Sequence, residues 1–301
     1  MKNKFNVVKF EKRLKRDFLT IIIPVYKDPK GISKTLKSLE KQKFDKKKYE
    51  IIVANDGADK KTQEKCKKFG VNIVNISKNK GSYNARNEAL KKARGEYIAF
   101  TDADLKVSKN WLSTGYEQLQ KYDYVGGKIE IDEKQLKDLA NYYEYLVAFD
   151  NKKKFEEYNY IPTANLFVKR EVIKELGGFD GRLRSGGDAE FGDRVYRSGK
   201  YKMGCNPELI VTHPPRDIEG IKKKYVRTQR GNLDLAYYYP GRFSNRSSYI
   251  KEFFTPLYKV LFSEREVDSI IELKLFFYCL YIGGANVSNL FKLKNEKRKE
   301  D

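Results

Sequence analysis

Runs of apolar residues recur along the first third of the chain and predict strands separated by helices. The runs at residues 20–25, 50–54 and 97–101 are largely aliphatic and β-branched, which is typical of strands buried on both faces of a sheet. Between these runs, the sequence predicts helices at residues 32–39, 62–69 and 83–93. It also predicts one further short strand at residues 72–76. Strands that alternate with helices indicate βαβ units, and therefore a mostly parallel sheet flanked by helices.

The second half of the chain has a less regular pattern. Residues 123–131 and 164–168 are predicted to be strands, the latter returning to the sheet, and residues 135–149 are a predicted helix rich in aromatics. From residue 212 on, the pattern is mainly helical. We therefore expect a basic N-terminal arm, an α/β domain and a helical C-terminal extension, at residues 1–17, 18–215 and 216–301.

Basic residues strongly outnumber acidic ones. The 301 residues include 62 Lys and Arg against 41 Asp and Glu, a formal charge of +21. This excess predicts attraction to nucleic acid, to an anionic membrane or to phosphorylated small molecules, although a lysine-rich proteome would also explain it. The cysteines, Cys66, Cys205 and Cys279, have no spacing typical of a zinc site or a disulfide framework. Together with an N-terminus that lacks a signal-peptide pattern, they indicate a cytoplasmic protein.

One apolar stretch bears on membrane contact. Residues 270–291 are rich in Leu, Phe, Tyr and Ile, but Glu272 and Lys274 interrupt the start. The uninterrupted part is shorter than the roughly 20 residues that a membrane-spanning helix needs. We predict a buried or interfacial helix, and leave open whether it contacts a membrane, a partner or the protein's own core.

Two carboxylates directly follow the third buried strand. Asp102 and Asp104 occupy alternate positions, so both side chains point to the same side if the chain is extended. Such a pair suits Mn²⁺ or Mg²⁺, which completes its coordination with phosphate oxygens and water, although such pairs also occur by chance in loops. Residues 26–28 and 55–57 put polar groups at two other strand ends. Because ligands collect at this edge of a parallel sheet, the coincidence favours a binding site.

Three further residues are candidates for nucleotide contacts. Asp56 follows the second buried strand and would accept hydrogen bonds from a base or a ribose, unless it only caps a helix or forms an Asx-turn. Lys80 and Arg86 surround a glycine near the start of a predicted helix, where the helix N-terminus favours a diphosphate. In so basic a protein, a solvated face explains both cations as well.

The region from residue 177 to residue 192 is rich in glycine and acidic residues and precedes another predicted helix. Asp188 or Glu190 would act as a general base toward an acceptor hydroxyl, and helix capping is the alternative for Asp188. His213, the only histidine, is a candidate metal ligand or phosphate contact, although a solitary histidine is usually packed or solvated. Arg227 and Arg230 are further candidates for phosphate contacts.

In order and spacing, these motifs resemble the inverting glycosyltransferases of family 2, which have the GT-A fold. The resemblance extends over about two thirds of the chain, from residue 18 to residue 213. The matching segments are Ile-Pro-Val-Tyr at 23–26, Val-Ala-Asn-Asp-Gly at 53–57, Asn-Lys-Gly at 79–81, Ala-Arg-Asn at 85–87, Gly-Glu-Tyr-Ile at 95–98, Thr-Asp-Ala-Asp at 101–104, Ala-Asn at 164–165, Gly-Gly-Phe-Asp at 177–180 and Gly-Asp-Ala-Glu-Phe-Gly at 187–192, with Arg194.

The resemblance implies a GT-A catalytic domain over residues 18–215 and a role for each matching residue. Asp102 would meet the ribose and metal-bound water, Asp104 would bind the metal, and Asp188 would deprotonate the acceptor for a single inverting displacement. The resemblance implies that the nucleoside pocket is lined by Pro24, Tyr26, Asp28 and Asp56, and that Asp56 contacts the base.

The chain departs from the family pattern at four positions. Asn55 replaces the first acidic residue of the usual Asp-Asp-Gly, and Gly187 replaces the Glu that usually precedes the base. Ala58 and Lys27 stand where Ser and Asn are common. The Gln-x-x-Arg-Trp motif and the transmembrane helices of processive polysaccharide synthases are missing, which favours an enzyme that adds one sugar.

We therefore expect a metal-dependent inverting glycosyltransferase that uses Mn²⁺ or Mg²⁺. Its expected partners are a nucleoside diphosphate sugar, most simply a UDP-sugar, and a glycan or lipid-linked acceptor in cell-surface polysaccharide or glycoconjugate synthesis. The basic surface and the stretch from residue 270 would hold it peripherally on the anionic inner face of the cell membrane. The alternative is an inactive relative that binds nucleic acid or a membrane surface. The strand-end carboxylates disfavour nucleic acid as a partner, and the sequence leaves the oligomeric state open.

Overall fold

The computed structural model describes residues 6–147, 151–243, 254, 256–258, 260–262 and 267–300. The chain divides into two compact units. The first comprises Met1–Glu130 and Asp150–His213, and the second comprises Ile131–Phe149 and Pro214–Asp301. The second unit therefore takes in the aromatic-rich segment before residue 150 as well as the C-terminal region.

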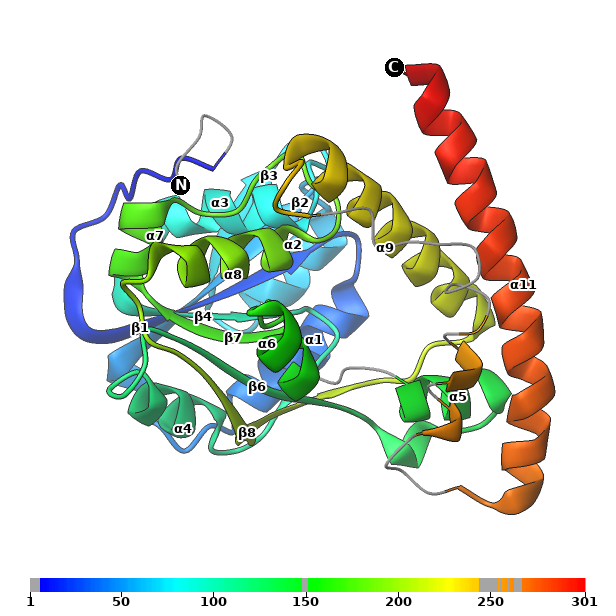
Figure 1. Ribbon diagram of the computed structural model, residues 1–301. Helices are drawn as coiled ribbons and strands as arrows, with labels where there is room; N and C mark the ends of the chain where they lie inside the picture. Colours follow the sequence, from blue (N-terminus) through cyan, green and yellow to red (C-terminus); the bar gives the residue numbers. More distant parts are fainter. Residues whose placement is uncertain are drawn as a thin grey trace. The chain divides into compact units, whose positions relative to one another are not determined.

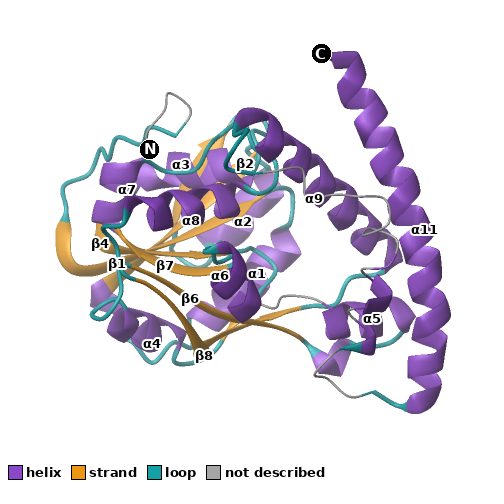
Figure 2. Cartoon of the chain, in the orientation of Figure 1, coloured by secondary structure: helices purple, strands orange, loops and turns teal. Residues whose placement is uncertain are grey.

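The first unit is built on a mixed sheet, which has eight strands among the described residues (Figures 1 and 2). The strand order is β3-β2-β1-β4-β7-β6-β8-β5. The first four strands pair in parallel, as the alternation of strands and helices predicts, whereas β7 pairs antiparallel with β4 and β6, and β5 pairs antiparallel with β8. The strands are β1 (Lys15–Val25), β2 (Tyr49–Asp56), β3 (Asn72–Ile76), β4 (Gly95–Thr101), β5 (Lys106–Val107), β6 (Tyr124–Ile131), β7 (Asn165–Lys169) and β8 (Met203–His213).

Helices connect these strands. The first begins where the sequence encodes a helix start, because Asp28 caps it by accepting a 2.7 Å hydrogen bond from the Gly31 amide, and Pro29 occupies the first turn. The helices of this unit are α1 (Pro29–Leu39), α2 (Lys60–Lys67), α3 (Ser82–Lys92), α4 (Trp111–Gln118), α6 (Asn151–Tyr158), α7 (Arg170–Leu176) and α8 (Gly187–Ser198), with a 3₁₀ turn at Lys46–Lys48.

Aromatic side chains pack against both faces of the sheet. Phe100 pairs with Leu166 across β4 and β7, and Phe167 pairs with Ala99, so the two phenylalanines point to opposite faces. On one face Phe100 contacts Phe179, with ring centroids 5.3 Å apart. On the other face Trp111 of α4 contacts Phe167 at 4.6 Å. The sheet is thus the middle layer of a two-sided core.

The described part of the N-terminal arm contacts the rest of the first unit at several points. Asn6 is fully buried, and the Arg170 guanidinium lies 3.8 Å from the centroid of the Phe10 ring. The Glu11 amide donates a 2.7 Å hydrogen bond to the Lys91 carbonyl. The described part of the arm is therefore held at these contacts although most of its residues are exposed, and β1 begins at Lys15, inside the predicted arm.

The described part of the second unit is helical, with α5 (Leu139–Val147), α9 (Ile218–Tyr238), α11 (Ser269–Glu300) and a 3₁₀ turn at Glu133–Gln135. Glu144 of α5 is buried and accepts hydrogen bonds from Arg216 (2.5 Å) and Lys224 (3.0 Å). Burial alone would raise the pKa of Glu144, but the charges of Lys224 and Arg216 outweigh it and hold this pKa below its usual value. The apolar core of the unit consists of Ala140, Tyr143, Leu146, Ile221, Val260, Leu275, Cys279 and Ile282.

Helix α11 is longer than the apolar stretch predicted at residues 270–291. Judged by length and composition alone, its segment Ser269–Leu293 would be able to cross a membrane. That is weak evidence, because helices in protein cores also meet the criterion, and 29% of the apolar window is buried within the structure. The same helix contributes Leu275, Cys279 and Ile282 to the core of its unit.

Candidate active site

The ends of β1, β2 and β4 lie at the same edge of the sheet because these strands are parallel. The Tyr26 ring lies over Gly57, where an added Cβ atom would come within 3.0 Å of Cε2 of the tyrosine. The start of α1 lies beside the loop after β4, since a Cβ at Gly31 would lie 3.0 Å from the Ala103 carbonyl oxygen. The three polar strand ends predicted from the sequence therefore meet, with Pro24 buried at the end of β1 and Asp28 capping α1.

Asp56, at the end of β2, is buried and organises a neighbouring loop. Its two carboxylate oxygens accept 2.9 Å hydrogen bonds from the backbone amides of Lys80 and Gly81. The helix cap at this strand end is Asp59 instead, which accepts from the Thr62 amide at 2.8 Å. Helix capping is therefore not the function of Asp56, and the side chain of Lys80 is exposed at the loop that it fixes.

Arg86 of α3 holds the first carboxylate of the pair after β4. Its Nη2 lies 2.5 Å from Asp102 Oδ1, and the arginine side chain is only 2% exposed. From α1, the Thr35 hydroxyl lies within hydrogen-bond distance of the carbonyls of Asp102 (3.3 Å) and Leu105 (2.7 Å). The loop is thereby fixed from two helices, while the side chain of Asp104 remains 42% exposed.

Asp104 and His213 come together although 109 positions separate them in the sequence. The two-residue strand β5 pairs with the end of β8, with Lys106 opposite Thr212 and Val107 opposite Val211. This ladder brings His213 Nε2 to 3.6 Å from Asp104 Oδ2. The two residues predicted as metal ligands are therefore neighbours, and the histidine is buried.

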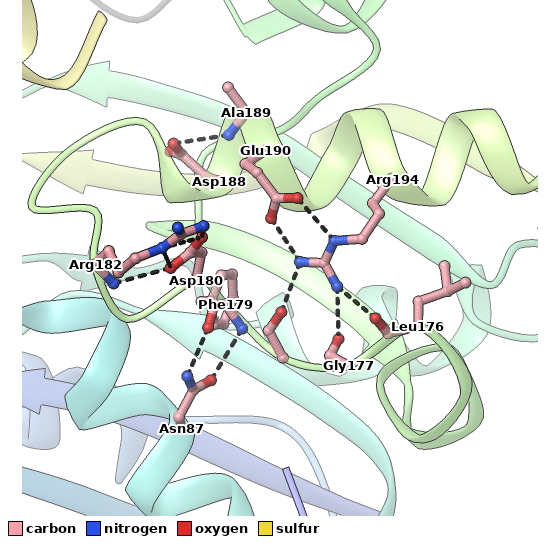
Figure 3. Close-up of polar contacts among 11 residues, drawn as sticks. Asn87, Leu176, Gly177, Phe179, Asp180, Arg182, Asp188, Ala189, Glu190 and Arg194 are labelled. Carbon is pink, nitrogen blue, oxygen red and sulfur yellow. Dashed lines mark hydrogen bonds and ion pairs between the residues drawn. The ribbon is translucent and has the colours of Figure 1, made fainter. Parts of the chain in front are cut away.

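Asp188 lies in the first turn of α8, whose N-cap is Gly186 (Figure 3). Its Oδ1 accepts hydrogen bonds from the Ala189 amide at 3.0 Å and from the Tyr83 hydroxyl at 3.2 Å. Asp188 is only half-buried, whereas Glu190, two residues later, is buried. It is therefore the more accessible of the two candidate bases.

Glu190 is 1% exposed and forms a two-point ion pair with Arg194, at 3.0 and 2.7 Å (Figure 3). The same guanidinium donates to the carbonyls of Leu176 (2.6 Å) and Gly178 (2.7 Å). A carboxylate held in this way has no access to an acceptor hydroxyl. Glu190 therefore holds Arg194 in place, and Arg194 connects α8 to the loop after α7.

Two of the four departures from the family pattern, Asn55 and Gly187, have local structural reasons. Asn55 donates through Nδ2 to the Asp59 carbonyl at 3.0 Å, a bond that an aspartate could not make. Lys27 and Ala58 both have positive φ, 49° and 48°, a conformation that does not favour either residue, and nothing in the structure explains these two departures. At Gly187, any Cβ would lie 2.8 Å from the Tyr83 ring, so Tyr83 fills the space that a side chain at this position would need.

Some contacts could not be anticipated from the sequence. Tyr83 gives no pattern that distinguishes it from the other tyrosines, and Thr35 is an ordinary residue of an amphipathic helix. Arg184, whose Nη1 lies 3.3 Å from Asn79 Oδ1, is one of many basic loop residues. The two arginines proposed as phosphate contacts, Arg227 and Arg230, belong to α9 in the second unit, whereas the strand-end residues belong to the first unit.

Comparison with known proteins identifies the family. The model of Glycosyl transferase family 2 matches residues 20–177. Glycosyltransferase AglE of Haloferax volcanii is 30% identical over 225 residues, which cover 72% of this chain and 74% of the relative. Glycosyltransferase GlyG of Streptococcus pneumoniae is 25% identical over 190 residues, which cover 55% of this chain and 61% of the relative.

Solved structures agree on the fold. The mannosyltransferase PcManGT of Pyrobaculum calidifontis, in complex with GDP-Man and Mn²⁺, has a TM-score of 0.65 at 16% identity, over 98% of this chain and 92% of that chain. Residues 1–349 of Staphylococcus aureus TarS, in complex with UDP, have a TM-score of 0.54 at 18% identity, over 94% and 92%. The chain therefore belongs to glycosyltransferase family 2, and it is a glycosyltransferase with the GT-A fold, in a family whose reaction inverts the anomeric carbon.

Proposed function

We propose that this enzyme transfers one sugar from a nucleoside diphosphate sugar to a hydroxyl group of a glycan or lipid-linked acceptor. The observation that carries the proposal is the pairing of Asp104 with His213 at 3.6 Å, at the strand ends where Asp56 and Asp102 also lie. This set of groups suits a diphosphate and a divalent cation. The process served would be the synthesis of cell-surface polysaccharides or glycoconjugates.

The residues present fit Mn²⁺ or Mg²⁺. One carboxylate and one imidazole are ligands that Mn²⁺ accepts, and both cations commonly bind to one or two protein groups together with phosphates and water. In the described part of the chain, no three His, Cys, Asp or Glu residues are gathered for a metal. Asp104 and His213 would therefore hold the ion together with the donor's diphosphate. When bound, the ion would neutralise charge on the departing diphosphate.

The chain's own groups would carry out the remaining steps. Asp188 would take the proton of the acceptor hydroxyl as that oxygen bonds to the anomeric carbon. The bond from this carbon to the diphosphate oxygen breaks, and its electron pair leaves with the nucleoside diphosphate. Pro24, Tyr26, Asp28 and Asp56 would surround the nucleoside, and the exposed Lys80 would attract the diphosphate. Arg86 would act by orienting Asp102, to which it is paired.

The test is a panel of nucleotide sugars with Mn²⁺, in which release of free nucleoside diphosphate is measured. We expect turnover with a UDP-sugar, which is supported by the UDP and UDP-GlcNAc complexes of TarS, although the GDP-Man complex of PcManGT makes GDP-sugars the necessary comparison. Failure of the enzyme to bind or turn over any donor would instead support an inactive relative that binds nucleic acid or a membrane.

Asp104→Asn is the variant that tests the metal site. Because the amide lacks the negative charge of the carboxylate, we expect the Mn²⁺ concentration for half-maximal turnover to rise by about 10- to 100-fold. Asp193→Asn, which changes an acidic residue paired with Arg197 on α8, is the control and should leave this concentration unchanged. An Asp104→Asn enzyme with the wild-type Mn²⁺ requirement would remove Asp104 from the site.

We further propose that the second unit binds peripherally to an anionic membrane on the cytoplasmic side. One face of α11 carries large apolar side chains at helical spacing, each more than half exposed: Ile270 65%, Leu273 63%, Phe277 64% and Tyr281 56%. The opposite face is buried in the core of the unit. Lys222 of α9 lies 5.6 Å from the Tyr281 ring centroid, so a cation borders the apolar face. Apolar insertion flanked by positive charge is how interfacial helices bind anionic lipid.

Flotation with phosphatidylserine-containing vesicles tests this surface. In Phe277→Ser/Tyr281→Ser we expect the partition coefficient to fall by about tenfold or more, because less apolar area enters the lipid. Tyr196→Ser, which changes a tyrosine 57% exposed on the first unit, is the matched control and should bind like wild type. Equal binding by the double variant would assign any membrane contact to another surface. Binding only to neutral vesicles would contradict the role of charge.

A further inference from the structure

We propose that Tyr83 is a positioning residue that holds the Asp188 carboxylate for proton abstraction from the acceptor. This inference rests on the proposed function, in which Asp188 is the general base. Tyr83 belongs to α3 and Asp188 to α8, 105 positions later, so the contact is a tertiary one.

The hydrogen bonds of the carboxylate all involve one oxygen. Oδ1 accepts from the Tyr83 hydroxyl at 3.2 Å and from the Ala189 amide at 3.0 Å. Among the described residues, no hydrogen bond or ion pair is formed by Oδ2. The arrangement therefore fixes the orientation of the group through Oδ1 and leaves Oδ2 for the acceptor hydroxyl. A base that is already oriented loses less freedom when the acceptor arrives.

The tyrosine ring is itself held in place. It is 6% exposed and contacts Phe179, with ring centroids 5.6 Å apart. On its other side it meets Gly187, where a Cβ atom would lie only 2.8 Å from Cδ2 of the ring. Position 187 therefore has to be glycine for the Tyr83 ring to lie where it can hold the next residue, Asp188.

The electrostatic environment keeps Tyr83 a hydrogen-bond donor. Burial raises the pKa of Tyr83 well above its usual value, and the negative charge of Asp188 raises it further. The phenol therefore stays protonated at neutral pH. Its bond to the carboxylate is charge-assisted, a class stronger than bonds between neutral groups.

Helix α3 carries residues that contact both the proposed general base, Asp188, and Asp102 on the donor side of the site. Arg86 lies three positions after Tyr83, with its Cζ 5.8 Å from the Tyr83 ring centroid, and it pairs with Asp102. One short rigid helix thus positions a group toward the acceptor and a group toward the nucleotide. The reacting oxygen and the anomeric carbon need such a fixed separation for in-line displacement.

Tyr83→Phe tests the proposal because it removes the hydroxyl and keeps the ring. We expect kcat to fall by about 10- to 100-fold, while KM for the donor and its binding affinity stay within about twofold. Tyr97→Phe is the matched control, because Tyr97 is also 6% exposed and lies at the opposite end of β4 from Asp102. It should lose comparable stability and keep wild-type kcat. In an Asp188→Asn background, Tyr83→Phe should cause no further loss.

Gly187→Ala is a second, independent variant, since its methyl group displaces the ring, and it should reproduce the fall in kcat at constant donor affinity. Wild-type kcat in Tyr83→Phe would overturn the proposal. So would a parallel loss of donor binding, which would show that the tyrosine supports the nucleotide pocket instead. Full activity of Asp188→Asn is a different outcome, because it would remove the base assignment itself, and with it the proposed mechanism.

Discussion

Asp188→Asn is expected to lower kcat for sugar transfer by about 10²- to 10⁴-fold, the range usual for loss of a general base. The amide keeps the shape of the side chain and still accepts the hydrogen bonds of Tyr83 and Ala189 through its oxygen. It has no basic oxygen to take the acceptor proton. Donor affinity, measured by calorimetry with the nucleotide and Mn²⁺, should therefore stay within about twofold of wild type.

The matched change on the same helix is Glu190→Gln. Because Glu190 is buried against Arg194, this substitution should reduce stability, and turnover per folded molecule should remain far above that of Asp188→Asn. If instead Asp188→Asn turns over at the wild-type rate, the proton must be taken by another group. If the variant loses donor binding as well as turnover, Asp188 contacts the nucleotide rather than the acceptor.

Arg194→Met is expected to lower the free energy of unfolding by about 3–5 kcal/mol. The substitution leaves Glu190 buried at 1% exposure without its counter-charge, and it removes the donors to the Leu176 and Gly178 carbonyls. Methionine fills a similar volume, so the loss is mainly electrostatic. Urea unfolding followed by tryptophan fluorescence of Trp111, the single tryptophan, measures the change in the unit that contains both residues.

Arg197→Met, four residues from Asp193 on the same helix, is the control for Arg194→Met. Its pair is solvent-exposed on the arginine side, at 56%, so the cost should be below about 1 kcal/mol. The double variant Glu190→Leu/Arg194→Met should be less destabilised than the sum of its single changes, because neither buried charge is then left alone. Additive effects would show that the two side chains do not act as a pair.

Much of the first unit could be predicted from the sequence because its periodicity is strong. The short strand at residues 72–76 has the bounds of β3, and the run before Asp102 is β4. The returning strand at residues 164–168 corresponds to β7. The direction of β7 was not predictable, because an apolar run has the same pattern whether it pairs in parallel or antiparallel. That direction depends on the long connection through α4 and β6, whose length alone does not specify it.

The positions of the candidate site residues at strand ends were predictable for the same reason. The groups to which these residues form hydrogen bonds were not. Asp56 follows a buried strand, but its bonds to the Lys80 and Gly81 amides come from a loop 24 positions later. β5 is too short to produce any periodicity. The sequence does carry one signal about Glu190: it lies four residues before Arg194 on a predicted helix, the spacing of an intrahelical ion pair, which argues against a free base.

The ladder between β5 and β8 has a consequence for how such enzymes diverge. Everything from residue 108 to residue 202 lies between the two strands that set Asp104 beside His213. Doubling the length of a flexible loop in that interval costs only about 0.6 kcal/mol in closure entropy, which grows slowly with loop length. New segments for a different acceptor can therefore be inserted there while Asp104 and His213, the pair proposed to bind the metal and the diphosphate, are kept. The segments between β5 and β8 are therefore free to change faster in evolution than Asp104 and His213.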